Sequence, residues 1–339
     1  MVSSQRQDGL TVGIYAHHQG SGHIRRCAAI AKELTTHFPT SSVTIFSSAQ
    51  GADISLPLDT DEYGTYQDVT ANGQWHWAPI AHEGLRERMG LIARWIDQEK
   101  PDVFYVDTSV EVSLFVRLMG IPVVSIVMPG TRQDPAHQEL YRIATALVGA
   151  WPETLPAPKS LLPFTNKFTA VGGLSRFSTK GLPAAQPERQ SDLVVVLQGK
   201  GGTQWDDQYW QQVEKYCKHW KIVTLGGSHR VDNPFPYLQR AACVISAAGQ
   251  NSVADIAAAQ VPAILIPQPR AFDEQSATAT SVANLNLAVV LDEMPELSQW
   301  PRLLERVTDT SPAWEQWVNP HAAEKIAHVI YQTGKGVRL

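Results

Sequence analysis

A loop near the N-terminus has the residue types that proton transfer beside a polar ligand requires. Residues 17–23 read HHQGSGH, and Arg25 and Arg26 follow almost directly. The glycines permit a tight turn and the close approach of a ligand. His23 stands where a helix is expected to begin, and a helix N-terminus favours the neutral imidazole, which can accept a proton. The loop therefore predicts a general base at His23, with a histidine that only caps the helix as the alternative.

Two glycine-containing loops in the second half have the composition of anion-binding loops. Each follows an expected strand and precedes an expected helix, so its backbone N–H groups can hold a phosphate. A plain turn between a strand and a helix is the alternative for both. The residues that we expect to line the anion site are Gly20 and Gly22 of the N-terminal loop, Gly199, Lys200, Gly201, Gly202 and Thr203 of the second loop, and Ala248, Gly249, Gln250, Asn251 and Ser252 of the third.

Carboxylates supply the remaining candidates for chemistry. Asp107 ends an expected strand and can orient the imidazole of His23, with Glu111 as a second candidate. Three residues at a later helix start can bind the vicinal hydroxyls of a sugar, although acidic residues there are also ordinary capping residues. These three residues are Asp273, Glu274 and Gln275.

One acidic pair resembles a metal site. Asp59 and Asp61 have the spacing of carboxylates that hold a divalent cation against a diphosphate. They lie in an acidic loop and do not follow a buried strand, so a solvated turn is the favoured interpretation. No metal site is predicted for this chain.

Apolar strands alternate with amphipathic helices on both sides of a stretch rich in Pro and Gly, residues 151–189. This α/β alternation predicts two parallel sheets with helices on both faces, and ligands bind beyond the carboxyl ends of such strands. We expect an N-terminal domain at residues 1–165, a linker at 166–189, a C-terminal domain at 190–318 and a closing helix at 319–339. The first domain should contain strands at 10–16, 43–47, 103–106 and 123–127, long loops at 56–79, and helices that begin near residue 24 and span 85–99, 110–119 and 136–150.

Composition excludes several classes of protein. The chain has 339 residues, enough for about two domains. Its net charge of -5 speaks against a nucleic-acid partner. Its three cysteines lack the spacing of a disulfide framework or a zinc site, and no stretch approaches the ~18 apolar residues of a membrane-spanning helix. We expect a cytoplasmic protein, at most peripheral at the inner face of a membrane.

Three residues are candidates for binding a second substrate. Trp75 and Trp77 lie in the long loop, where their indole faces can stack on a sugar or anchor the loop, and His18 lies within the N-terminal loop. The expected helix from residue 85 has basic and apolar residues that can contact a lipid surface weakly, although an ordinary surface helix is the favoured interpretation.

The order of these motifs resembles the GT-B glycosyltransferases, specifically family 28. Gly22 and His23 match the Gly-His that ends the family's first loop, and residues 198–203 resemble the loop that opens its second domain. Residues 248–259 and 267–275 are similar to its small-residue loop with the following helix and to its proline-then-acid-Gln element. Where the family has a ribose-binding Glu, this chain has Asp255, which is one methylene shorter.

The resemblance implies a GT-B fold in which two Rossmann-like domains face each other across a cleft. It implies an inverting, metal-independent transfer of a hexosyl or N-acetylhexosaminyl group from a UDP-sugar to a hydroxyl acceptor, with His23 as the base. The acceptor would be a sugar, a lipid-linked molecule or another small molecule, and the nucleotide-sugar is a substrate, so no cofactor is implied.

A second resemblance leaves an alternative function open. Residues 20–26, GSGHIRR, are similar to the Gly-x-Gly-His-x-x-Arg signature of the UDP-sugar hydrolase of the pseudaminic acid pathway. That enzyme shares the GT-B fold and uses the histidine of the motif to activate water. A nucleotide-sugar hydrolase or epimerase is therefore the second hypothesis, and a catalytically silent nucleotide-sugar sensor is the third.

Overall fold

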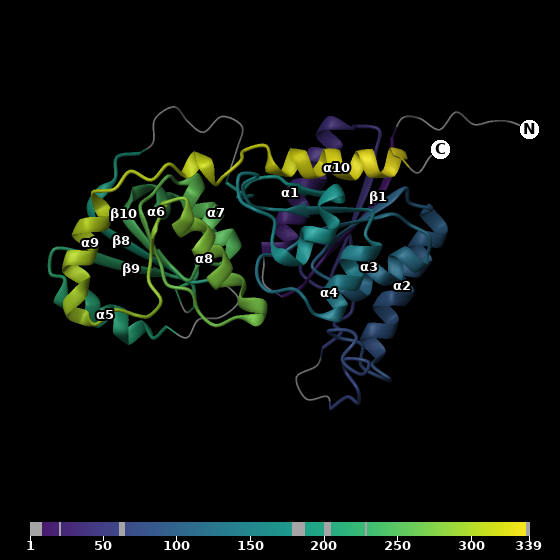
Figure 1. Cartoon of the computed structure of the whole chain (residues 1–339), viewed down its shortest axis with the longest axis horizontal. Helices are drawn as coiled ribbons and strands as arrows, with labels where there is room; N and C mark the ends of the chain where they lie inside the picture. The colour runs from purple at the N-terminus through teal and green to yellow at the C-terminus, as the bar shows by residue number, and fades with distance from the viewer. Residues whose placement is uncertain are drawn as a thin grey trace, which may run out of the picture.

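The chain folds into two α/β halves, each built on one parallel sheet (Figure 1). The computed structural model describes residues 9–19, 22–60, 65–177, 187–199, 205–227 and 229–336. All pairings between the named strands are parallel. The alternation of strands and helices in the sequence therefore predicted the fold class correctly.

The sheet of the first half has the strand order β3-β2-β1-β4-β5-β6-β7 among the described residues. Helices α1 and α10 cover one face, where they pack on apolar side chains of β1, β4 and β5. Helices α2 and α3 cover the other face. The elements are β1 (Thr11–Ala16), α1 (Gly22–His37), β2 (Ser42–Ser47), β3 (Ile54–Ser55), α2 (Glu83–Glu99), β4 (Val103–Asp107), α3 (Val110–Leu118), β5 (Val123–Val127), α4 (Pro135–Ile143), β6 (Ala146–Gly149) and β7 (Phe168–Ala170).

The helix predicted at residues 136–150 was wrong in its second part. Helix α4 ends at Ile143, and Ala146–Gly149 forms strand β6 beside β5. A short buried apolar run has the same pattern in a strand and in a buried helix, so periodicity could not separate the two. Strand β7 lies within the range expected for the linker and pairs with β6.

The sheet of the second half has the strand order β12-β11-β10-β8-β9. Helices α7 and α8 pack on one face, and α5 and α9 pack on the other. The elements are β8 (Gln190–Leu197), α5 (Asp207–Tyr216), β9 (Lys221–Leu225), α6 (Phe235–Arg240), β10 (Ala241–Ser246), α7 (Gln250–Ala258), β11 (Ala263–Leu265), α8 (Glu274–Asn284), β12 (Val289–Val290) and α9 (Trp300–Thr308), and they are followed in the chain by α10 (Ala322–Gly336).

The last helix returns to the first half. Figure 1 shows α10, in yellow, lying along the lobe that contains β1 and α1. Its buried residues Ile326 and Ile330 belong to the same apolar cluster as Leu10 and Ile30. The chain thus crosses between the halves twice, and segments that follow strands of both sheets line one cleft.

Helix α2 does not present the basic and apolar face considered for membrane contact. Arg88 is only 1% exposed, Ile92 is fully buried, and Met89 and Leu91 pack against the same core. Among the described helices, none is long and apolar enough to cross a membrane.

Candidate active site

A cleft of about 1000 Å³ lies between the two halves. Its walls are the segments that follow the strands of both sheets, as expected for open parallel sheets. His17 and Thr108 come from the first half, and Gln198, Gly226 and Ser246 come from the second. Several arginines add positive charge to this cleft, namely Arg25, Arg176, Arg230 and Arg270.

His23 and Asp107, which the sequence placed 84 positions apart, meet at this cleft. His23 lies in the first turn of α1, and its Nδ1 is 2.7 Å from Oδ1 of Asp107 at the end of β4. Arg26 Nη2 also lies 3.2 Å from Nδ1, but the contact with Asp107 is the shorter one and an ionised carboxylate can only accept, so we assign Nδ1–H as the donor to Asp107, which leaves Nε2 its lone pair. The imidazole therefore has the orientation and tautomer of a general base.

Arg26 is a residue that sequence reasoning left without a role. Its Nε donates to Oδ2 of Asp107 and its Nη2 donates to Oδ1, both at 2.7 Å, while Asp107 is fully buried and Arg26 is 3% exposed. Burial alone would raise the pKa of Asp107, but Arg26 and His23 hold it well below its usual range. Asp107 is thus a permanent anion beside the imidazole.

Glu111 does not lie beside His23 and holds the long loop instead. Its Oε1 accepts from the backbone N–H groups of His76, at 2.9 Å, and Trp77, at 3.1 Å. The Trp77 indole donates to the carbonyl of Asp59 at 2.6 Å, and Trp75 packs against an apolar cluster of the first half. Neither indole is among the residues that line the cleft, so the structure favours their loop-anchoring role.

Asp59 has other surroundings than the solvated turn favoured from the sequence, whereas the expectation that His18 binds an acceptor stays a prediction. Asp59 does not sit in a solvated turn, because its side chain is 14% exposed and forms an ion pair with buried Arg88. His18 Nε2 is 3.8 Å from the same carboxylate, and the His18 ring stacks on His17. His18 therefore packs against a ring that lines the cleft, although it is not itself among the lining residues.

The start of α7 forms the opposite wall. Gly249 is the N-cap residue of this helix, and Gln250, Asn251 and Ser252 line the cleft with it. A Cβ at Gly22 would lie 2.1 Å from Nδ2 of Asn251, so glycine at this position lets the two helix starts approach closely. Ala248 is buried and precedes them with a left-handed φ of 62°.

Asp255 lines the cleft, but its carboxylate already has partners. Ser175 Oγ donates to Oδ1 at 2.7 Å, and Arg176 Nε is 3.5 Å from Oδ2. Both partners come from the segment that connects the halves. Gly199, Glu274 and Gln275 also line the cleft, whereas Asp273 does not. Gly20, Lys200, Gly201, Gly202 and Thr203 lie outside the described residues.

Phe272, in the loop before α8, packs into a socket that His137 and Arg132 of the first half form. Its ring lies 4.8 Å from the ring of His137 and 4.7 Å from the guanidinium carbon of Arg132. Thr131 N–H donates to the Phe272 carbonyl at 2.7 Å. Phe272 and Asp273 both have left-handed backbones, with φ of 59° and 54°, so the first half holds a strained loop in place.

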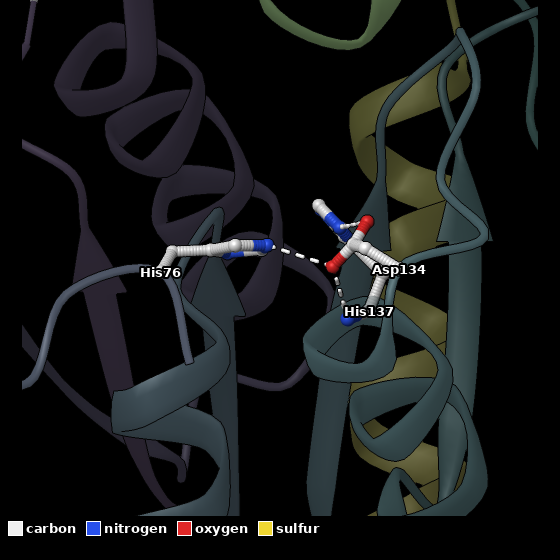
Figure 2. Close-up of side chains that lie close together, drawn as sticks. All are labelled: His76, Asp134 and His137. Atoms are coloured by element: carbon white, nitrogen blue, oxygen red, sulfur yellow. Dashed lines mark hydrogen bonds and ion pairs between the residues drawn. The ribbon is translucent and has the colours of Figure 1, made fainter. Parts of the chain in front are cut away.

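Figure 2 shows the side chains on the floor of this socket, where His76 and His137 approach Asp134 from two sides. Arg132 Nη1 donates to His137 Nε2 at 2.9 Å, so His137 Nδ1 carries the proton that it donates to Asp134 at 2.7 Å. Burial, assisted by Arg132, lowers the pKa of His137 to about 4. Although the three groups are close enough for one metal ion, both ring nitrogens of His137 are already engaged.

Comparisons with known proteins show which sequences and folds this chain resembles. Residues 183–313 match the glycosyltransferase family 28 C-terminal domain. A UDP-N-acetylglucosamine--N-acetylmuramyl-(pentapeptide) pyrophosphoryl-undecaprenol N-acetylglucosamine transferase of Synechococcus sp. (strain CC9311) is 26% identical over 229 residues. That alignment covers 60% of this chain and 62% of the relative, so less than two thirds of the relative is matched.

Two solved structures share the fold across almost the whole chain. Acinetobacter baumannii MurG has a TM-score of 0.63 and 16% identity, with 95% of this chain and 99% of that chain covered. UDP-GlcNAc 2-epimerase from Methanocaldococcus jannaschii has a TM-score of 0.65 and 11% identity, with 95% and 100% covered. The fold is therefore GT-B, as the resemblance implied.

Proposed function

We propose that this chain, whose residues 183–313 match the glycosyltransferase family 28 C-terminal domain, transfers a sugar from a nucleotide-sugar to a hydroxyl acceptor. The observation that carries the proposal is the His23–Asp107 contact of 2.7 Å at a cleft whose other wall is the start of α7. One wall offers a base and the other offers donors for an anion. A transfer that expels a diphosphate needs both.

In the proposed reaction, His23 Nε2 takes the proton of the acceptor hydroxyl. The acceptor oxygen forms a bond to the anomeric carbon from the face opposite the diphosphate. The bond from that carbon to the phosphate oxygen breaks, and its electron pair leaves with the nucleoside diphosphate. Attack from the opposite face inverts the anomeric carbon. Asp107 stabilises the imidazolium that forms, because it stays ionised.

The donor would lie on the second half. In this proposal the backbone N–H groups of Gly249 and of the first turn of α7, which line the cleft, bind its diphosphate, assisted by Arg25 and Arg270. The name of the Synechococcus relative supports a UDP-linked N-acetylhexosamine as the sugar donor. These donors act without a metal ion, so we expect turnover to continue in EDTA, and loss of turnover on chelation would contradict this part.

A nucleotide-sugar hydrolase or epimerase is the second candidate, and Arg26 is the observation that favours it. In the hydrolase signature the arginine follows the histidine by three positions, and here that arginine holds the anion that orients His23. The fold shared with the 2-epimerase is compatible with either outcome. The two candidates differ in whether water or an acceptor hydroxyl is the nucleophile.

One experiment separates the candidates. The protein is incubated with UDP-, dTDP- and GDP-sugars, and free nucleotide and sugar products are followed with and without glycoside and lipid acceptors. Nucleotide release that depends on an acceptor supports the transferase, whereas rapid release without one supports the hydrolase. We expect His23→Ala to lower either reaction about 10²- to 10⁴-fold. Full activity in this variant would refute the assignment of the base.

A further inference from the structure

A second histidine, His17, lies beside the proposed base. It follows β1 directly and lines the cleft, and its ring centroid is 5.7 Å from that of His23 with the planes inclined by 60°. Nothing in the reaction described above uses it. Both imidazoles line the cleft, on the wall formed by the first half.

The protonation of His17 follows from its backbone partner. The N–H of Gln19 points at His17 Nδ1 at 3.1 Å, and an N–H group can only donate. Nδ1 therefore holds a lone pair, and in the neutral ring the proton is on Nε2. No described residue accepts a hydrogen bond from this Nε2. His17 thus offers one N–H donor to the cleft.

Its surroundings keep this donor neutral and fixed in orientation. Burial, followed by the neighbouring His23 and His18, lowers the pKa of His17 to about 4. The ring stacks on His18 at 4.8 Å with planes 13° apart, and His18 in turn lies next to the ion pair of Asp59 and Arg88. A neutral imidazole N–H of this kind can donate to the oxygen of an uncharged hydroxyl group.

We propose that His17 binds the acceptor by donating Nε2–H to the hydroxyl adjacent to the one that His23 deprotonates, so that the acceptor is a sugar or polyol with vicinal hydroxyls. This inference rests on the proposed transfer reaction and names its acceptor class. His23 accepts a proton from one oxygen and His17 donates to its neighbour. Water has no second oxygen, so it can react with the donor without the help of His17.

The difference between transfer and hydrolysis provides the test. We compare wild type, His17→Phe, His17→Gln and His23→Ala with UDP-N-acetylglucosamine and UDP-glucose as donors. The acceptors are methyl glycosides and their monodeoxy analogues, which lack one hydroxyl of the pair, and slow hydrolysis of the donor is measured without an acceptor. His17→Phe keeps a ring to stack on His18 but lacks the N–H, whereas His17→Gln keeps an N–H donor.

We expect His17→Phe to lower kcat/KM for the glycoside about 10- to 100-fold, a larger loss than that of donor hydrolysis in the same variant. His17→Gln should recover part of the lost kcat/KM. In wild type the deoxy analogue should be a poorer acceptor than the glycoside that keeps both hydroxyls, and in His17→Phe the two should react equally well. Equal losses of transfer and hydrolysis in His17→Phe, or unchanged transfer, would overturn the role of His17 without affecting the proposed transfer reaction. Wild-type hydrolysis of the donor without any transfer would overturn the proposed transferase activity. Full activity of His23→Ala would overturn the assignment of His23 as its base.

Discussion

Replacement of Asp107 by Asn tests the centre of the proposed site, because the change keeps the shape of the side chain and removes its charge. Asp107 is fully buried and accepts from His23, from two nitrogens of Arg26 and from the Thr108 hydroxyl. The variant leaves the Arg26 cation, 3% exposed, without its counter-charge. Two effects should follow, one on stability and one on turnover.

The expected loss of stability is that of a broken buried ion pair, about 3–5 kcal/mol. At about 1.4 kcal/mol per factor of ten, this lowers the folding equilibrium constant about 10²- to 10⁴-fold. Because the pKa of Asp107 is lowered in the folded chain, its stabilisation is complete above the ordinary value near 3.9 and lost as the pH falls below it. Wild type should therefore destabilise on acidification more steeply than the variant.

The expected loss of turnover comes from the imidazole. In Asp107→Asn the new amide can turn its NH₂ group toward Nδ1 of His23 and so stabilise the tautomer that has no lone pair at Nε2. In a Ser-His-Asp triad the same change costs about 10⁴ in kcat, and we expect about 10²- to 10⁴-fold here. Urea unfolding gives the stability, and nucleotide release below the unfolding transition gives the turnover.

A matched control separates the two effects. Arg26→Gln combined with Asp107→Asn removes both charges, so it should recover much of the stability and none of the turnover. A stability loss under about 1 kcal/mol, which is the size of an exposed ion pair, would refute the buried pair as described. Turnover within tenfold of wild type would refute the role of Asp107 in holding the base.

Two further perturbations probe the contact between the halves. In Gly130→Ala the new Cβ would lie 2.0 Å from the Phe272 carbonyl at a φ of +106°, so we expect a loss of about 1–3 kcal/mol and a higher KM for the nucleotide-sugar. Gly120→Ala, with a φ of +83° and open space, measures the backbone cost alone, and equal effects of both variants on KM would contradict the link to Phe272. The pKa of His137 is lowered to about 4, so the stabilisation associated with its neutral ring is complete above pH 6.5 and lost as the pH falls toward 4, by up to about 3 kcal/mol. His137→Gln should lose less stability over this interval in urea unfolding at a series of pH values, and an unchanged pH slope would exclude His137 as the titrating group.

The sequence predicted those parts of the site that depend on a local pattern. Asp107 ends a continuous apolar strand, and His23 follows a glycine turn at a helix start, so each was placed at the carboxyl edge of one sheet. Parallel strands bring such edges together, which is why two residues far apart in the chain could be expected to meet.

The parts that were missed depend on pairing between distant charges. Arg26 and Arg88 stand in helices where a basic residue normally faces water, and only the carboxylates of Asp107 and Asp59 make their burial favourable. No local pattern distinguishes a buried partner from a solvated one. The donor role of His17 likewise depends on which of its nitrogens Gln19 occupies.

The return of α10 to the first half affects the order in which the two halves complete their folding. Ile326 and Ile330 fill the face of the first sheet beside Leu10, and Gly334 lets the helix approach within contact of that leucine. During synthesis this face stays uncovered until after residues 190–318 have emerged. The second half can therefore form its own core while the first still exposes apolar surface, and the half that is made first is the one completed last.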